Sequence, residues 1–268
     1  MFKEFDVSFR NEVLNSSTSK GTQRKWFVDD FLIKADMLGY ESISEVVVAD
    51  FLSYVDNIDF VDYSLCNISI GDSASLTGCY SKYFLKSEEE YVSFQRLLKL
   101  FYGSEKKLNL SLRGYQGKDK CREVISIVQE LTGLDVSCYV SNMLKIDALI
   151  LNEDRHFNNM GVIKGIDYWR LCPIFDNGLS LLSDTNDYPF GTPVRFLCNR
   201  VKAKPFSTDF IKQAKYIDSS LLVIDFKSFR DDLSSKYVEF KNKEFMRATS
   251  VLLSRCSKLE GIIWEQKK

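Results

Sequence analysis

The sequence lacks the marks of a membrane protein, a disulfide-stapled domain or a secreted chain. It contains no run of about 18 apolar residues that could span a bilayer, and its first residues are not a basic segment followed by an apolar one. The seven cysteines are scattered and never form a C-x-x-C pair, which argues against a zinc ribbon or a redox pair. We therefore expect a cytoplasmic protein with reduced, mostly buried thiols and no membrane partner.

An excess of positive charge is also absent, and proline is scarce. Lys and Arg number 36 against 37 for Asp and Glu, so no global positive field exists to recruit nucleic acid. A small molecule or a protein is the expected substrate, with no direct nucleic-acid contact. Only four prolines and no internal repeat occur, so a division into domains must come from hydrophobic patterning. With 268 residues, of which 45% are hydrophobic, the chain can bury a sizeable core.

The hydrophobic pattern changes along the chain. Short aromatic and β-branched runs at 25–28, 31–34 and 60–66 predict strands, and the apolar spacing over 42–55 predicts a helix. From residue 88 onward, apolar stripes over 91–101, 124–131 and 237–264 repeat at helical spacing. The pattern predicts an α+β fold with a small β-rich N-lobe over 1–80, a larger, mainly helical C-lobe over 81–268, and a ligand cleft between them.

The most informative segments read Leu-Asn-Glu-Asp-Arg-His-Phe-Asn-Asn at 151–159 and Pro-Ile-Phe-Asp-Asn-Gly at 173–178. A helix ending near Asn152 would place Asp154 and Asn159 on one loop, and a short apolar strand would carry Asp176 beside them. Such oxygen ligands suit Mg²⁺, which keeps part of its coordination for phosphates and water. Phosphoryl transfer needs that metal and a carboxylate that orients the attacking hydroxyl. The Asp-x-x-x-x-Asn spacing followed by hydrophobic-Asp-x-Gly repeats the catalytic and metal loops of kinases.

A purely structural interpretation of this segment also exists. Turns rich in Asn and Asp are common because these side chains bond their own backbone, and this accounts for Asn158 and Asn159 taken alone. The complete set of two acidic groups, an Asn and a Gly at these spacings favours a catalytic site. His156 is the only histidine in the chain, and we expect it to shape the loop or touch phosphate rather than transfer a proton.

These two motifs resemble the active-site signature of the HipA-like serine/threonine kinases, bacterial enzymes often found as toxins of toxin–antitoxin pairs. The resemblance implies a bilobal, protein-kinase-like fold and a kinase that uses ATP and Mg²⁺. By position, Asp154 matches the catalytic aspartate, Asn159 and Asp176 match the metal-binding pair, and His156 matches a histidine near the nucleotide. The resemblance covers nearly the whole chain, which corresponds to the kinase core of longer relatives.

The N-terminal part carries a further resemblance. Thr18-Ser-Lys-Gly-Thr-Gln-Arg-Lys25 is similar to the Ser-x-x-Gly-x-Gln-x-Lys loop that covers the phosphates in this family. The match assigns ATP binding to Gly21, Thr22 and Gln23, and autophosphorylation to Thr18. Gly21 would permit close backbone approach to phosphate oxygens, although such a stretch is usually a mobile surface loop. Phosphate on Thr18, or on the adjacent Ser16, Ser17 or Ser19, would add nearly two negative charges, which we expect to expel the loop from the cleft and silence the enzyme.

Further positions follow from the same resemblance. Lys34 ends an apolar run and resembles the strand lysine that reaches the nucleotide phosphates, and Glu45 on the next helix is placed to pair with it. A strand-end lysine can also extend its amino group into solvent. Tyr83 falls where a hinge should present backbone groups to adenine. The Lys204-Pro-Phe206 segment resembles a feature of the family's C-terminal lobe, and we assign it to packing.

Two other functions stay open at this point. Asp-Arg-His-x-x-Asn is also similar to the phosphoinositide kinase loop, which makes a lipid or small-molecule kinase an alternative, although the near-neutral chain shows no obvious basic membrane patch. An ATP-binding pseudokinase acting as a regulatory partner is the other, but all three phosphoryl-transfer positions carry competent residues. For the favoured kinase, the resemblance implies a protein substrate, such as a translation factor or an aminoacyl-tRNA synthetase, and an antitoxin protein as partner.

Overall fold

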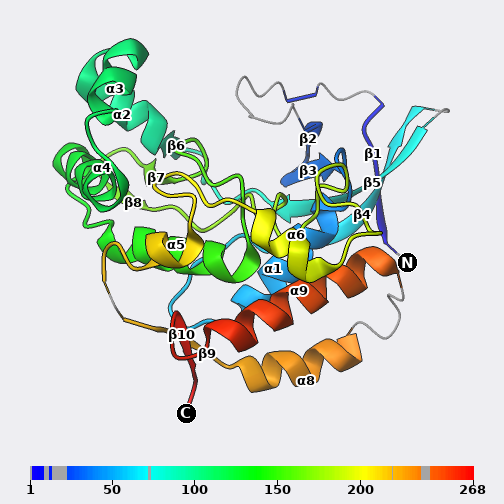
Figure 1. The fold of residues 1–268 in the computed structure, drawn as a ribbon. Coiled ribbons are helices and arrows are strands. Elements are labelled where there is room, and N and C mark those ends of the chain that lie inside the picture. Colours follow the sequence, from blue (N-terminus) through cyan, green and yellow to red (C-terminus); the bar gives the residue numbers. More distant parts are fainter. Residues whose placement is uncertain (1, 9–11, 14–22, 72–73, 219, 237–241) are drawn as a thin grey trace.

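A β-rich part and a mainly helical part make up the molecule. The computed structural model describes residues 2–8, 12–13, 23–71, 74–218, 220–236 and 242–268. Figure 1 shows the N-terminal strands at one end of the molecule, helices α2, α3 and α4 at the opposite end, and helices α1, α5 and α9 between them. The expected α+β division is therefore confirmed.

The N-terminal part is a five-stranded sheet in the order β1-β4-β5-β3-β2. Its strands are β1 (Lys3–Asp6), β2 (Lys25–Val28), β3 (Phe31–Ala35), β4 (Ser64–Ile70) and β5 (Ala74–Lys82). β1 runs parallel to β4, and the other neighbours are antiparallel. Between β2 and β3 the chain turns at Asp29, whose φ of 52° is one that Asp tolerates better than most residues. The strands predicted at 25–28 and 31–34 are thus confirmed.

Helix α1 (Glu41–Leu52) joins the sheet to the rest of the molecule and confirms the helix predicted over 42–55, with an earlier end. It packs against β4 and β5 and against α9 (Lys243–Leu259). Its buried Val47, Val48 and Phe51 belong to the same hydrophobic cluster as Ala248 and Val251 of α9. Because α1 shares this core, its position is fixed relative to the C-terminal helices.

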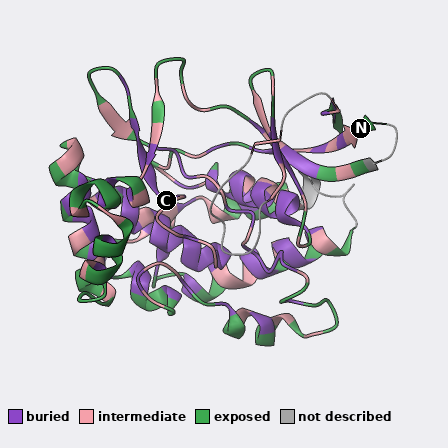
Figure 2. Ribbon diagram, turned by 90° about the horizontal axis from the view of Figure 1, so that it is seen from above, coloured by how far each residue is buried: buried purple, intermediate pink, exposed green. Residues whose placement is uncertain are grey.

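The second part surrounds helix α5, which is buried along nearly its whole length. Besides α9, the helices of this part are α2 (Phe94–Tyr102), α3 (Glu105–Leu112), α4 (Gly117–Thr132), α5 (Ser137–Ile150), α6 (Val194–Arg200), α7 (Phe210–Ala214) and α8 (Phe226–Lys236). Two small sheets accompany them: β6 (Glu90–Ser93), β7 (Gly161–Lys164) and β8 (Trp169–Leu171) in one, and β9 (Leu222–Ile224) with β10 (Trp264–Gln266) in the other. Figure 2 shows the buried residues gathered in the central helices and the exposed ones on outer helices and loop tips.

Several predicted boundaries were wrong for local reasons. Tyr91 lies in strand β6 rather than in a helix, because α2 begins only at Phe94, where the Ser93 side chain accepts the Arg96 N–H and caps it. The strand expected at 60–66 begins at Ser64, and residue 174 makes a single bridge to residue 60 instead of belonging to a strand.

The last predicted helix is shorter than the pattern suggested. Within 237–264, α9 ends at Leu259 and Trp264 belongs to strand β10, while 237–241 lie outside the described residues. The helix predicted over 124–131 is confirmed as part of α4. The predicted boundary between residues 80 and 81 falls inside β5 and stays a prediction.

The cysteines agree with the expectation from the sequence. All seven cysteines are free, and most are buried, as expected; the buried ones are Cys66, Cys79, Cys121, Cys172 and Cys256. Burial raises the pKa of the Cys66 and Cys121 thiols to about 12. Among the described helices, none combines the length and the apolar character that crossing a membrane requires.

Candidate active site

The end of helix α5 positions the predicted catalytic loop. The helix stops at Ile150 because Leu151 adopts a left-handed conformation, with φ of 55°. The buried Asn152 then accepts the N–H of Asp154 through its side-chain oxygen at 3.0 Å. The predicted helix end near Asn152 is confirmed, and this turn presents Asp154 with its side chain 13% exposed.

Asn159 closes the same loop from its other end. Its side-chain oxygen accepts the His156 N–H at 2.9 Å, and its amide nitrogen donates to the Asp154 carbonyl oxygen at 2.9 Å. Bonding of an Asn side chain to nearby backbone is what the structural interpretation of the motif expects. The same amide oxygen keeps a second lone pair, so holding the loop and binding a cation are compatible tasks for this residue.

Arg155 connects the catalytic loop to the segment that carries Asp176. Its guanidinium is fully buried and donates to both carboxylate oxygens of Asp147 on α5 at 2.9 to 3.2 Å. It also donates to the Phe175 carbonyl at 3.2 Å and to the Asn177 side chain at 2.8 Å. Burial opposes the charge of Arg155, but the Asp147 carboxylate outweighs it and raises the Arg155 pKa. One buried cation thus fixes two loops against one helix.

Sequence reasoning missed this network. The available signal was Asp147, a carboxylate within the mainly apolar second half of α5. A buried charge needs a partner, and Arg155 is a basic residue inside the catalytic motif itself.

Lys34 and Glu45 form the buried ion pair that the sequence predicted. The Lys34 amino group lies 2.7 Å from a Glu45 carboxylate oxygen and 2.9 Å from Asp176 Oδ1, and the lysine and glutamate side chains are 2% and 1% exposed. Burial works against the charged lysine, but Asp176 and Glu45 together hold the Lys34 pKa well above its usual value. Gly78 of β5 lets the strands approach here, since a Cβ would meet the Lys34 carbonyl oxygen at 2.3 Å.

Glu45 also holds the Asp176 segment by its backbone. Its second carboxylate oxygen accepts the Asn177 N–H at 2.9 Å, and Asp176 itself has a positive φ of 61°. Lys25 lies 3.9 Å from the same Asp176 oxygen that Lys34 contacts. Burial would raise the pKa of Asp176, but Lys25 and Lys34 outweigh this effect and hold the pKa of the carboxyl well below its usual range.

A cavity of about 420 Å³ brings most of these residues together. Its polar lining includes Lys25, Lys34, His156, Asn159 and Asp176. Its apolar and aromatic lining includes Phe27, Leu32, Val61, Tyr83, Phe84 and Phe175. A cavity with an apolar wall and convergent charges is typical of small-molecule sites.

Of the other predicted positions, Tyr83 lines this cavity, Gln23 does not, and the rest lie outside the described residues. Tyr83 lines the cavity, but its backbone N–H donates to the Asp30 carbonyl at 2.8 Å and is not free for a ligand. Gln23 donates to the Ala35 carbonyl at 3.0 Å and so links the segment before β2 to the end of β3. Residues Thr18, Gly21 and Thr22 lie outside the described residues.

The residues present fit a nucleotide with a divalent cation. Within the described part of the chain, both ion pairs of Asp176 use Oδ1, which leaves Oδ2 for a cation, and Asn159 lines the same cavity. The buried Nδ1 of His156 has no hydrogen-bond partner among the described residues, although His156 lines the cavity. Two hard oxygen ligands with two lysines nearby match a Mg²⁺-phosphate group.

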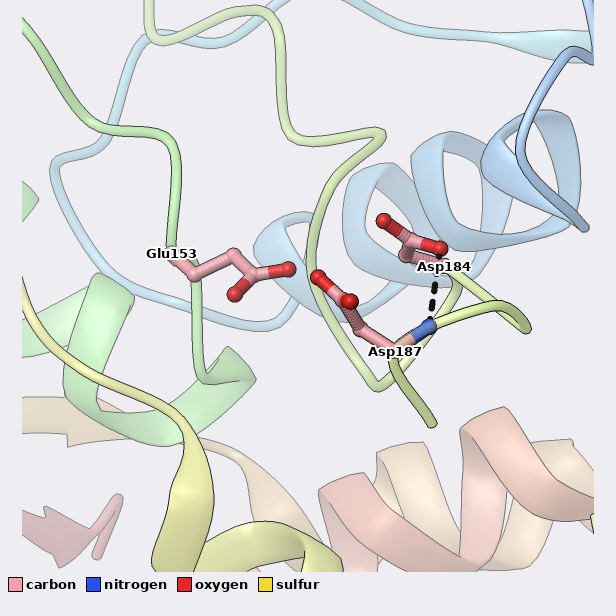
Figure 3. A group of neighbouring side chains, drawn as sticks. All are labelled: Glu153, Asp184 and Asp187. Carbon is pink, nitrogen blue, oxygen red and sulfur yellow. Dashed lines mark hydrogen bonds between the residues drawn. The ribbon is translucent and has the colours of Figure 1, made fainter. Parts of the chain in front are cut away.

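A second group of carboxylates lies next to the catalytic loop. Glu153, Asp184 and Asp187 have carboxylate oxygens within 4.8 Å of one another, and Figure 3 shows the three side chains pointing toward a common space. Tyr188 donates its hydroxyl to Glu153 at 2.6 Å, and the Asp187 N–H donates to Asp184 at 3.3 Å. Their hydrogen bonds join the catalytic loop to the chain beyond Asp176.

Comparison with solved structures identifies the fold. The chain is similar to the Helicobacter pylori proinflammatory kinase CtkA, with a TM-score of 0.57 and 15% identity over 95% of both chains. The fold is kinase-like. It also aligns with HipA of Shewanella oneidensis MR-1, solved with HipB and operator DNA, at a TM-score of 0.44 and 11% identity, covering 90% of this chain and 65% of that one. No family model matches the sequence, and no curated protein matches it.

Replacing Lys34 with methionine should weaken both the fold and nucleotide binding. Glu45 would keep its charge in a buried position without its ion-pair partner, so we expect the free energy of unfolding to fall by about 3 kcal/mol. ATP affinity should fall with it. Denaturant unfolding and ATP titration measure the two effects, and the exposed Lys86→Met variant is the control, with a change within about 0.5 kcal/mol. Equal stability of both variants would show that the ion pair does not hold this site.

Proposed function

We propose that this protein is a serine/threonine protein kinase that depends on ATP and Mg²⁺. The observation that carries the proposal is the cluster of Lys34, Glu45 and Asp176, held by contacts of 2.7 and 2.9 Å at one cavity. The loop bearing Asp154 and Asn159 is tied to that cluster through the buried Arg155. Phosphoryl transfer needs a phosphate-binding lysine, a metal-binding pair and an acceptor-orienting carboxylate in one place.

Different residues of the cavity bind different parts of the nucleotide. Lys34, with Lys25 nearby, holds the phosphate oxygens, and the apolar wall formed by Phe27, Leu32 and Tyr83 takes the adenine ring. Glu45 keeps Lys34 directed toward Asp176 and so toward the phosphates. Catalysis by these groups consists mainly of positioning and of charge neutralisation.

The metal and the acceptor lie at the other end of the nucleotide. Asn159 and Asp176 would hold Mg²⁺, which supplies charge neutralisation for the phosphates when bound. Asp154 orients a Ser or Thr hydroxyl and accepts its proton as the oxygen attacks. His156, which lines the cavity and lies 3.8 Å from Asp154, contacts the phosphate to be transferred.

The finer biological assignments rest on the sequence motifs. We include in the proposal a cytoplasmic enzyme of the HipA type that autophosphorylates at Thr18 and modifies a protein, with a translation factor or an aminoacyl-tRNA synthetase as the expected target. An antitoxin protein is the expected partner. Intact-mass analysis after incubation with ATP should show added phosphate, and peptide mass spectrometry should place it on residues 16–19; its absence there would remove the Thr18 assignment.

Labelled ATP can separate this function from the two alternatives. Purified protein, Mg²⁺ and γ-labelled ATP are incubated with bacterial lysate in one sample and with phosphatidylinositol vesicles in another. Label on protein bands supports a protein kinase, and label only in lipid establishes the lipid-kinase alternative instead. Bound ATP without any transfer would overturn the proposal in favour of a regulatory pseudokinase.

A further inference from the structure

Lys204 belongs to a segment that buried hydrogen bonds hold against the catalytic loop. The fully buried Gln213 of α7 accepts the N–H groups of Phe206 and Ser207, each at 3.1 Å, and donates to the Lys204 carbonyl at 2.7 Å. The ring of Phe206 packs on that of Phe157 in the catalytic loop, with centroids 5.6 Å apart. The backbone of Lys204 is therefore fixed relative to Asp154.

The side chain of Lys204 reaches the proposed catalytic carboxylate. Its amino group lies 3.5 Å from Asp154 Oδ1, while His156 Nε2 lies 3.8 Å from the other oxygen, Oδ2. Asp154 thus stands between two nitrogen groups that come from different parts of the chain. The Lys204 side chain is 43% exposed, so solvent reaches it.

The two nitrogen groups differ in their relation to the nucleotide cavity. His156 is part of the cavity lining together with Lys34, Asn159 and Asp176, whereas Lys204 is not among the described residues that line it. In an in-line displacement the acceptor approaches the phosphorus from the side opposite the leaving ADP. Lys204 therefore approaches Asp154 from a part of the chain that does not line the nucleotide cavity.

We propose that Lys204 is a catalytic residue of the acceptor side, a role beyond the packing assigned from sequence and one that rests on the proposed kinase function. The hydroxyl oxygen of the acceptor forms a bond to the γ-phosphorus, and its proton goes to Asp154. The bond from the γ-phosphorus to the bridging oxygen breaks, and its electron pair leaves on ADP. The Lys204 amino group contacts the transferred phosphoryl oxygens and offsets the negative charge that gathers beside Asp154.

This placement predicts different roles for Lys34 and Lys204. Lys34 contacts Asp176 inside the cavity, so its loss should affect ATP binding. Lys204 should affect the transfer step alone, because it meets the phosphoryl group only as the acceptor arrives. A lysine that merely held the segment would not separate kcat from KM in this way.

The test compares Lys204→Met, Lys204→Arg and the control Lys202→Met, an exposed lysine of the same segment. With the acceptor that wild type labels, or with water if no acceptor is found, kcat and KM for ATP are measured. We expect Lys204→Met to lower kcat by about 10- to 100-fold and to leave KM for ATP within about twofold of wild type. The expected loss is smaller than for removal of a buried donor, because Lys204 is partly exposed. Lys204→Arg should recover part of kcat, and Lys202→Met should match wild type.

The outcomes separate this inference from the proposed function. An active wild type with unchanged kcat in Lys204→Met would overturn the role of Lys204 and leave the kinase assignment intact. A rise in KM for ATP with unchanged kcat would also overturn it, because it would place Lys204 on the nucleotide. A wild type that transfers the γ-phosphoryl group neither to protein nor to water would overturn the kinase function, and the role of Lys204 with it.

Discussion

Replacing Asp154 with asparagine is expected to lower the rate of phosphoryl transfer by about 10²- to 10⁴-fold, the range for loss of a positioned general base. The amide keeps the size of the side chain but cannot accept the hydroxyl proton. ATP affinity should stay close to that of wild type, because Asp154 is not among the described residues that line the nucleotide cavity. Transfer rates from labelled ATP and an ATP titration measure the two quantities.

The control for this variant is Asp167→Asn, an exposed aspartate of the β7–β8 turn. It removes the same charge outside the catalytic loop and outside the residues that line the cavity, and should leave both quantities unchanged. If Asp154→Asn keeps a transfer rate within a few fold of wild type, another group orients the acceptor and the assignment of Asp154 is wrong.

The largest loss of stability is expected for Arg155→Met, at about 3–5 kcal/mol of unfolding free energy. This change leaves Asp147, a fully buried carboxylate, without its ion-pair partner. It also removes the donors to the Phe175 carbonyl and to Asn177, which hold the segment that carries Asp176. Transfer activity should fall together with stability, as the two loops lose their common anchor. Denaturant unfolding followed by fluorescence measures the free energy.

An exposed ion pair of the same chemistry provides the matched control. Arg96 pairs with Glu90, and these side chains are 60% and 54% exposed, so Arg96→Met should cost less than about 1 kcal/mol. A double variant, Arg155→Met with Asp147→Leu, should recover part of the loss because no buried charge is left unpaired. The account of this network fails if Arg155→Met is no more costly than Arg96→Met.

The candidate site could be predicted largely because its parts are local in sequence. Asp154 and Asn159 lie on one loop, whose turn is closed by the side chains of Asn152 and Asn159 bonding to the backbone of Asp154. Lys34 and Glu45 lie on a strand and the helix that follows it, so their pairing needs little long-range information. The partners of Arg155 could not be predicted, since they come from α5 and from beyond β8 and meet only when the chain has folded.

The fold was predictable where one apolar spacing continued over a long stretch of sequence, and less predictable where one element gives way to the next. The pattern that predicts a helix through Tyr91 is interrupted by Ser93, whose capping of α2 leaves the preceding residues to pair with β7. Strand β1 was not predicted, because its support is a parallel pairing with the distant β4. Likewise, Lys204 was assigned to packing because its contact with Asp154 joins segments far apart in sequence.

The most direct test of the central claim follows γ-phosphoryl transfer from ATP in four samples. These are wild type with Mg²⁺, wild type with the metal chelated, Asp154→Asn and Asp176→Asn, with ATP binding measured on each preparation. We predict transfer in the first sample alone, together with retained ATP binding in Asp154→Asn. Transfer that is insensitive to chelation, or that continues unchanged in both variants, would contradict the assignment of phosphoryl transfer to this site.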